Sequence, residues 1–151
     1  MSTAPIVVED LSHFYGSGEL RRQILFDVST QIEAGEIVIV TGPSVSGKTT
    51  LLTLVGALRS AQHGSLRVLG QELANAAPAA LESVRKQIGY IFQSHNLIAA
   101  LSAQQNVEMA LRLHRKHDRA SVQRKAAEML EAVGLGDRLD HHPEQLSGGQ
   151  R

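Results

Sequence analysis

The chain has 151 residues, with 15 Lys and Arg against 15 Asp and Glu and a formal net charge of zero. This balance argues against a partner that is bound mainly by charge, such as nucleic acid or an anionic membrane surface. The absence of cysteine excludes disulfides and thiolate metal sites. No apolar run approaches the ~20 residues that span a bilayer, and the first residues lack a secretory pattern. Any membrane role is therefore expected to come through a partner.

The first ~90 residues are expected to be rich in strands. Residues 6–8 and the alternating run 24–32 predict two strands. Residues 37–41, Ile-Val-Ile-Val-Thr, are apolar on both faces and predict a central strand of a parallel sheet. A helix, a strand, a helix and a strand are then expected at residues 48–58, 64–70, 78–86 and 88–92.

The last third is expected to be helical. Ser102 and Gln105 form a capping-box pattern for one helix, and Ser121 is expected to cap a second. Apolar residues recur at three- and four-residue steps in the second helix, which predicts one buried face. They are Val122, Ala126, Met129, Leu130 and Val133.

A phosphate-binding loop stands between the predicted strand 37–41 and the predicted helix. The segment Gly42-Pro43-Ser44-Val45-Ser46-Gly47-Lys48-Thr49 has the spacing G-x-x-x-x-G-K-[ST] in the context that this motif requires. Glycines allow backbone N–H groups to surround a phosphate chain, and the start of the helix adds its positive dipole end. The Lys48 ammonium can reach the terminal phosphates, and the Thr49 hydroxyl can bind Mg²⁺.

Val45 is unexpected inside this loop, where a small residue suits the backbone better. A β-branched residue disfavours a positive φ. If the loop needs that conformation here, Val45 adds about 1–3 kcal/mol of local strain. We therefore expect weakened nucleotide binding; the alternative is that the position tolerates valine.

A second glycine motif, Leu146-Ser147-Gly148-Gly149-Gln150, stands next to the last residue, Arg151. Ser147 and Gln150 have the spacing of a capping box for a helix that is about to begin. The exposed N–H groups of such a helix start form another anion site. On its own this motif is weak, because Ser-Gly-Gly is also common in linkers.

In this order the segments resemble the nucleotide-binding subunit of ATP-binding cassette (ABC) transporters. The resemblance covers residue 6 to residue 151 and includes Gln93 in the run Ile-Phe-Gln-Ser-His-Asn-Leu. It implies an α/β fold, a P-loop NTPase cassette with a β-rich N-terminal part, a central parallel sheet and an α-helical subdomain. The expected organisation is an ATP-binding core part at residues 1–94, the helical subdomain at 95–146 and the start of the signature helix at 147–151.

The same resemblance assigns ATP and Mg²⁺ as ligands. Tyr15 matches the aromatic residue that stacks on adenine, and Thr49 and Gln93 would hold Mg²⁺. The signature residues would act in trans, on the ATP of a second subunit in a head-to-tail dimer; they are Ser147, Gly148, Gly149 and Gln150. The expected ATP-binding set is Tyr15, Gly42, Pro43, Ser44, Val45, Ser46, Gly47, Lys48, Thr49, Thr50 and Gln93.

The wording of the motifs looks most like the lipoprotein-release and macrolide-export branch, and within it the heterocyst-glycolipid exporter (DevA-type) subunits. That branch implies transmembrane permease subunits as partners, with a periplasmic adaptor as a further candidate. The expected place is peripheral, on the cytoplasmic side of the inner membrane. No nucleic-acid partner is expected, because the basic residues between Arg112 and Lys125 alternate with acids and aromatic content is only 3%.

The family pattern continues with an apolar strand ending in Asp-Glu, and this chain has no such segment. We therefore expect a C-terminally incomplete cassette in which Lys48 is the remaining catalytic residue and ATP hydrolysis is negligible. The rival is a non-catalytic fragment that at most binds nucleotide. A soluble cassette protein of translation or DNA repair is a third class, but no second cassette or coiled-coil insertion is visible. The seven histidines are expected to be surface residues and not metal ligands.

Overall fold

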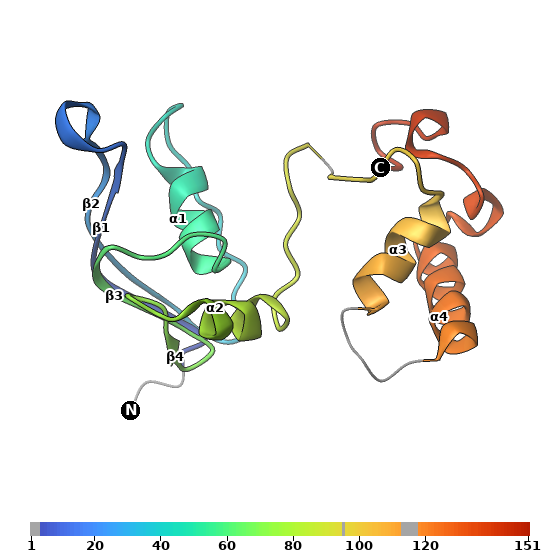
Figure 1. The fold of residues 1–151 in the computed structure, drawn as a ribbon, viewed down its shortest axis with the longest axis horizontal. Helices are drawn as coiled ribbons and strands as arrows, with labels where there is room; N and C mark the ends of the chain where they lie inside the picture. The colour runs from blue at the N-terminus through green and yellow to red at the C-terminus, as the bar shows by residue number, and fades with distance from the viewer. Residues whose placement is uncertain (1–3, 95, 113–117) are drawn as a thin grey trace. The chain divides into compact units, whose positions relative to one another are not determined.

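The computed structural model describes residues 4–94, 96–112 and 118–151. It forms two compact units, Met1–Tyr90 and Ile91–Arg151. Each unit has its own elements and its own hydrophobic cluster. The units are therefore described one at a time (Figure 1).

The first unit is built on a four-stranded sheet of order β2-β1-β3-β4. A long hairpin joins β1 (Ile6–Tyr15) to β2 (Arg22–Ile32) through the short 3₁₀ helix η1 (Gly18–Leu20). The strands β3 (His63–Val68) and β4 (Gln71–Glu72) continue the sheet on the other side of β1, and every pairing is antiparallel. The strands predicted at residues 6–8, 24–32 and 64–70 are confirmed.

Two helices complete this unit, α1 (Lys48–Val55) and α2 (Pro78–Arg85). Pro78 occupies the first turn of α2, where its missing N–H costs no helical hydrogen bond. Strands and helices share one core, because each has an apolar side that only the others can cover. Its largest fully buried side chains are Val8, Leu11, Leu54, Leu66, Val68, Leu73 and Val84.

The predicted central parallel strands are wrong as secondary structure. Residues 37–41 and 88–92 belong to no strand, and among the described residues the sheet is antiparallel. Ile37 and Ile39 are 94% and 81% exposed, and Ile91 is 94% exposed. A parallel strand obtains its backbone hydrogen bonds and its apolar cover from neighbouring strands and crossover helices. In the described part of the chain neither segment is paired in the sheet, although Ile88 packs against the core of the first unit.

The second unit is helical, as predicted. It contains α3 (Ala103–Arg112), α4 (Arg119–Ala132) and the 3₁₀ turns η2 (Gly136–Arg138) and η3 (Pro143–Gln145). No helix among the described residues is long and apolar enough to cross a membrane.

Capping explains where both long helices begin. The box ahead of α3 is confirmed, because Ser102 N donates to Gln105 Oε1 at 2.9 Å and Gln105 N donates to Ser102 Oγ at 3.3 Å. The predicted cap of α4 is wrong by three residues. Asp118 is the N-cap, and its carboxylate accepts from the backbone N–H of Ser121 at 2.9 Å.

Only part of the predicted apolar face of α4 is buried. Val122, Ala126 and Leu130 are buried, whereas Met129 and Val133 are exposed. Leu130 packs in a small cluster with Ala103 and Leu146. The second glycine motif is therefore anchored at its first residue, Leu146, in the core of the second unit.

Candidate functional site

The phosphate loop of the first unit adopts a set of backbone conformations that few residue types accept. Gly42 has φ 146° and Gly47, the N-cap of α1, has φ 90°. Ser46 N donates to Pro43 O at 3.4 Å, and Leu51 N donates to Gly47 O at 2.9 Å. The chain therefore turns sharply at residues 43–46 and enters α1 directly, which is the backbone path predicted for this motif.

Lys48 reaches back over the loop. Its Nζ donates to Gly42 O at 2.8 Å, to Pro43 O at 2.6 Å and to Ser46 Oγ at 3.3 Å. An ammonium group has three donors, and here all three have acceptors within the loop. The cation is thus held beside the backbone that the motif uses to receive an anion.

Val45 has a positive φ of 59°, and its side chain is 98% exposed. The conformation on which the expected strain depended is therefore present. Because the side chain packs on nothing, no burial offsets the cost of a β-branched residue in the left-handed region. That cost is about 1–3 kcal/mol.

Gly47 fits closely against β2. A Cβ placed at Gly47 would lie 2.7 Å from Leu25 Cδ2 and 3.0 Å from Ile24 O. Such distances are shorter than van der Waals contact, so the absence of a side chain allows the loop to lie against the strand. The sheet therefore fixes where α1 begins.

Tyr15 joins the hairpin to α1 at the edge of the loop. Its hydroxyl lies 3.3 Å from Thr50 Oγ1, and Thr50 is buried. A cavity of about 340 Å³ opens there. The cavity is lined by Tyr15, Ile24, Val45, Ser46, Gly47, Lys48, Thr49 and Thr50.

The structure thus gathers six of the predicted ATP-binding residues, from Val45 to Thr50, around one cavity with Tyr15. Gly42 and Pro43 line a smaller adjoining cavity of about 300 Å³. Ser44 is exposed in the turn, and Thr49, the candidate Mg²⁺ ligand, is exposed at the start of α1.

The other predicted residues lie in the second unit. Gln93 is exposed in a turn. Ser147 N donates to Gln150 Oε1 at 3.0 Å, which is the reciprocal half of a capping box, and Gln150 N donates to Ser147 O at 3.0 Å. A Cβ at Gly148 or Gly149 would meet nothing within 4 Å. The backbone of the signature segment is therefore open to solvent.

Two residues beside Tyr15 were not predicted as part of the site. His13 makes an edge-to-face contact with the Tyr15 ring at 5.1 Å between centroids, and the Arg59 guanidinium lies 4.9 Å from the Tyr15 centroid. Residues i and i+2 of a strand share a face, but the predicted strand covered only residues 6–8, whereas β1 continues to Tyr15, so the pairing of His13 with Tyr15 was missed. No local pattern brings Arg59 to Tyr15, because their contact depends on how α1 packs.

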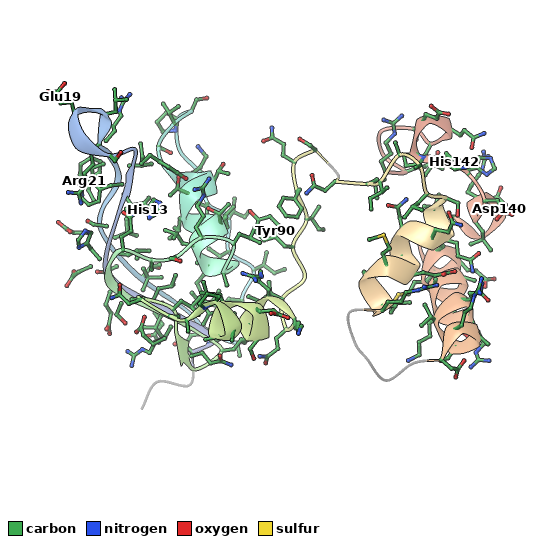
Figure 2. The ribbon with its side chains drawn as sticks, viewed as in Figure 1. His13, Glu19, Arg21, Tyr90, Asp140 and His142 are labelled. Atoms are coloured by element: carbon green, nitrogen blue, oxygen red, sulfur yellow. The ribbon has the colours of Figure 1, made fainter. Side chains whose placement is uncertain are left out.

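The histidines were expected to lie on the surface and not to bind metal. The first expectation is wrong for His13, and the second is untested. His13 projects from the β1–β2 hairpin (Figure 2). It is only 4% exposed and so is not a surface residue. Among the described residues no group of three His, Asp or Glu side chains could hold a metal ion. His95, His114 and His117 lie outside the described residues.

Comparison with known proteins decides the family. The profile of the family described as ABC transporter matches residues 25–151. The chain belongs to the ABC transporter family.

Individual ABC proteins agree with this assignment. An uncharacterized ABC transporter ATP-binding protein from Thermotoga maritima is 42% identical over 143 residues, which cover 94% of this chain and 61% of that protein. The macrolide export ATP-binding/permease protein MacB of Salmonella choleraesuis is 41% identical over 150 residues, 99% of this chain and 23% of MacB. The chain thus spans less than two thirds of these relatives.

Solved ABC cassettes share the fold. The dimeric cassette MJ0796 in a post-hydrolysis state bound to ADP and Pi superimposes with a TM-score of 0.87 at 32% identity, over 96% of this chain and 64% of that chain. A second dimeric structure of MJ0796, described as a bacterial ABC transporter cassette, matches equally well. The predicted α/β cassette fold is confirmed, and the chain covers part of it.

Proposed function

We propose that the chain is the ATP-binding part of an ABC export transporter. The carrying observation is the cavity that Tyr15 shares with the phosphate loop and the start of α1. It places an aromatic ring, backbone N–H groups and an ammonium group along one surface, as a nucleoside triphosphate requires. Solved relatives with ADP and Pi support the same ligand class.

The residues take separate roles in this proposal. Tyr15 stacks on adenine, residues 42–47 surround the phosphates, and Lys48 leaves its loop carbonyls for the terminal phosphates. By the family resemblance Thr49 and Gln93 would each be ligands of Mg²⁺, which would neutralise phosphate charge, and Thr50 would contact the phosphates from α1. Positioning and electrostatic stabilisation then supply most of the catalysis.

Signature residues Ser147 to Gln150 act in trans in a head-to-tail dimer, in keeping with the dimeric cassettes among the similar structures. We assign residues 1–94 to the ATP-binding core, 95–146 to the helical subdomain and 147–151 to the start of the signature helix. The similarity to MacB supports an export branch with permease partners. We further propose that the exporter is of the DevA type and that it works with a periplasmic adaptor. The chain would lie at the cytoplasmic side of the membrane as a peripheral subunit.

A second candidate function is nucleotide binding without turnover. One observation favours it for this chain: among the described residues no Asp or Glu lines the cavity. The cavity therefore lacks the carboxylate that the family resemblance assigns to polarising the attacking water. Separately from hydrolysis, the strained backbone at Val45 would weaken nucleotide binding.

The test uses the 151-residue chain with Mg²⁺ and ATP, measured by titration calorimetry and by phosphate release. Saturable binding that Lys48→Ala removes, with no phosphate release, supports the ATP-binding assignment and the second candidate for this chain. Release that Lys48→Ala abolishes supports an active ATPase. Absence of ATP binding by the purified, folded chain contradicts both.

A further inference from the structure

Tyr15 is held from three directions by side chains of the first unit. The Arg59 guanidinium lies over its ring, 4.9 Å from the centroid. The His13 ring meets it edge-to-face at 5.1 Å, with an interplanar angle of 83°. Its hydroxyl contacts Thr50 Oγ1 at 3.3 Å. A tyrosine with a ring partner, a cation and a hydroxyl partner has little freedom to change rotamer.

These partners differ in their relation to the cavity. Tyr15 and Thr50 line it, whereas His13 and Arg59 do not. His13 is buried in β1, and Arg59 follows α1 on the exposed surface. The histidine and the cation therefore contact Tyr15 from outside the space that a ligand would occupy.

We propose that Arg59 and His13 are positioning residues that hold the Tyr15 ring ready to stack on the base of a nucleotide. This rests on the proposed function, because it assumes that the cavity takes a nucleotide. Arg59 acts through its position over the Tyr15 ring, and His13 acts through the edge-to-face contact between the two rings. Neither residue needs to touch the ligand.

The chemistry of the two partners suits this role. A guanidinium group stacks on an aromatic face through both its charge and its planar shape, which an ammonium group matches only in charge. Burial, and then the Arg59 charge, lower the pKa of His13, so the imidazole is neutral near pH 7. A neutral ring packs beside Arg59 without charge repulsion, so both can contact Tyr15 at once.

The experiment separates base recognition from phosphate recognition. Dissociation constants for ATP and for inorganic tripolyphosphate, each with Mg²⁺, are measured calorimetrically on the full chain. Tripolyphosphate binding reports the phosphate loop alone. The dissociation constant for tripolyphosphate divided by that for ATP reports the contribution of the base, and this ratio falls when base recognition is lost. A general electrostatic effect of losing one positive charge acts on both ligands, and at least as strongly on tripolyphosphate, which carries more negative charge than ATP. It therefore does not produce a selective loss of ATP binding.

We expect Arg59→Gln to weaken ATP binding about three- to tenfold while changing tripolyphosphate binding less than about twofold. Arg59→Lys should lower this ratio less than Arg59→Gln does, because it keeps the positive charge. His13→Ala should reduce this ratio, and His13→Phe, which keeps an aromatic ring beside Tyr15, should preserve it. Arg59 is exposed, so its variants should remain folded, and circular dichroism verifies this.

Arg21→Gln is the matched control. Arg21 is also exposed and lies over a neighbouring aromatic ring, 4.0 Å from the centroid of Phe14, which is not a cavity residue. It loses the same charge and the same kind of contact, so its ratio should equal that of the wild type.

Each other outcome contradicts the proposal. An unchanged ratio in Arg59→Gln, or an equal loss for both ligands, means that Arg59 does not act through Tyr15. Tighter ATP binding means that the guanidinium occupies the place of the base. If the wild type binds tripolyphosphate but not ATP, the proposed base site is contradicted, whereas the proposed phosphate site is not. Failure to bind either ligand contradicts the proposed function as well.

Discussion

The ammonium Nζ of Lys48 donates to the backbone carbonyl of Pro43 at 2.6 Å, so the positive charge of the phosphate loop is bound by the loop itself. A charged donor on a carbonyl forms one of the stronger protein hydrogen bonds. An incoming phosphate must offer Lys48 more than these carbonyls do.

Lys48→Met should therefore weaken binding of inorganic tripolyphosphate by about 30- to 150-fold, which corresponds to the loss of 2–3 kcal/mol from a charge-assisted contact. Calorimetric titration measures this. Lys86→Met is the control, because Lys86 pairs with Glu82 on the surface of α2 and lies outside the cavity. Equal affinities for the Lys48 variant and the wild type would contradict the role of Lys48.

Val45 should be the position at which substitution strengthens the site. At φ 59° glycine and asparagine are the favoured residues, so we expect stability and nucleotide affinity to rank glycine above asparagine above alanine and valine. The gain of Val45→Gly is about 0.5–2 kcal/mol, since relief of strain is partly offset by the entropy of glycine in the unfolded chain.

Urea unfolding and ATP titration of these three Val45 variants provide the ranking. Alanine is the informative comparison, because it removes the same exposed methyl groups without accepting a positive φ easily. If alanine matches glycine, the cause is the size of the side chain and not the backbone conformation.

Gly47→Ala should be far more damaging than Gly35→Ala. Both glycines have a positive φ, 90° and 83°, but a Cβ at Gly47 meets Leu25 at 2.7 Å, whereas at Gly35 it meets nothing within 4 Å. We expect a loss of about 1 kcal/mol at Gly35 and about 2–4 kcal/mol at Gly47. Urea unfolding measures both, and similar losses would argue against close packing of the loop on β2.

The stability of the first unit should depend on the protonation of His13. Burial, and then Arg59, lower its pKa below 6.5, and its Nδ1 is buried without a hydrogen-bond partner. The unfolded chain therefore binds the proton more readily. The contribution is complete above pH 6.5 and is lost as the pH falls through the folded-state pKa.

Unfolding free energies of the wild type and of His13→Phe, measured from pH 8 to pH 5, isolate this contribution as the difference between two curves. The wild type should lose stability relative to the variant below pH 6.5. Arg59 and Tyr15 are the groups found against His13. Parallel curves would show that His13 folds without losing its proton affinity.

Local patterns predicted most of the elements. The run 24–32 alternates in sequence and forms part of β2, α3 has a complete capping box, and the phosphate loop has a spacing that few other structures need. Each of these signals lies within a dozen residues, so no tertiary information was required. The cap of α4 was misplaced because Asp118 and Ser121 are both good N-cap residues, and only geometry shows which carboxylate or hydroxyl faces the free N–H groups.

Long-range relations could not be predicted in the same way. The apolar composition of residues 37–41 predicted a strand covered on both faces, but these residues form no strand, because strand pairing depends on other segments. The contact between Arg59 and Tyr15 joins residues that share no periodic pattern. Val45 lies between these cases: the sequence marked it as unusual, and the positive φ gave the reason.

The exposed run Ile37–Val40 has a consequence for handling the protein. Four β-branched residues without charge or proline, with Ile37 94% and Ile39 81% exposed, form a short segment of the type that stacks between molecules into intermolecular sheets. Aggregation of the chain should therefore increase steeply with its concentration. Ile39→Lys, which introduces a charge in the middle of the run, is the simplest change that would keep it dispersed.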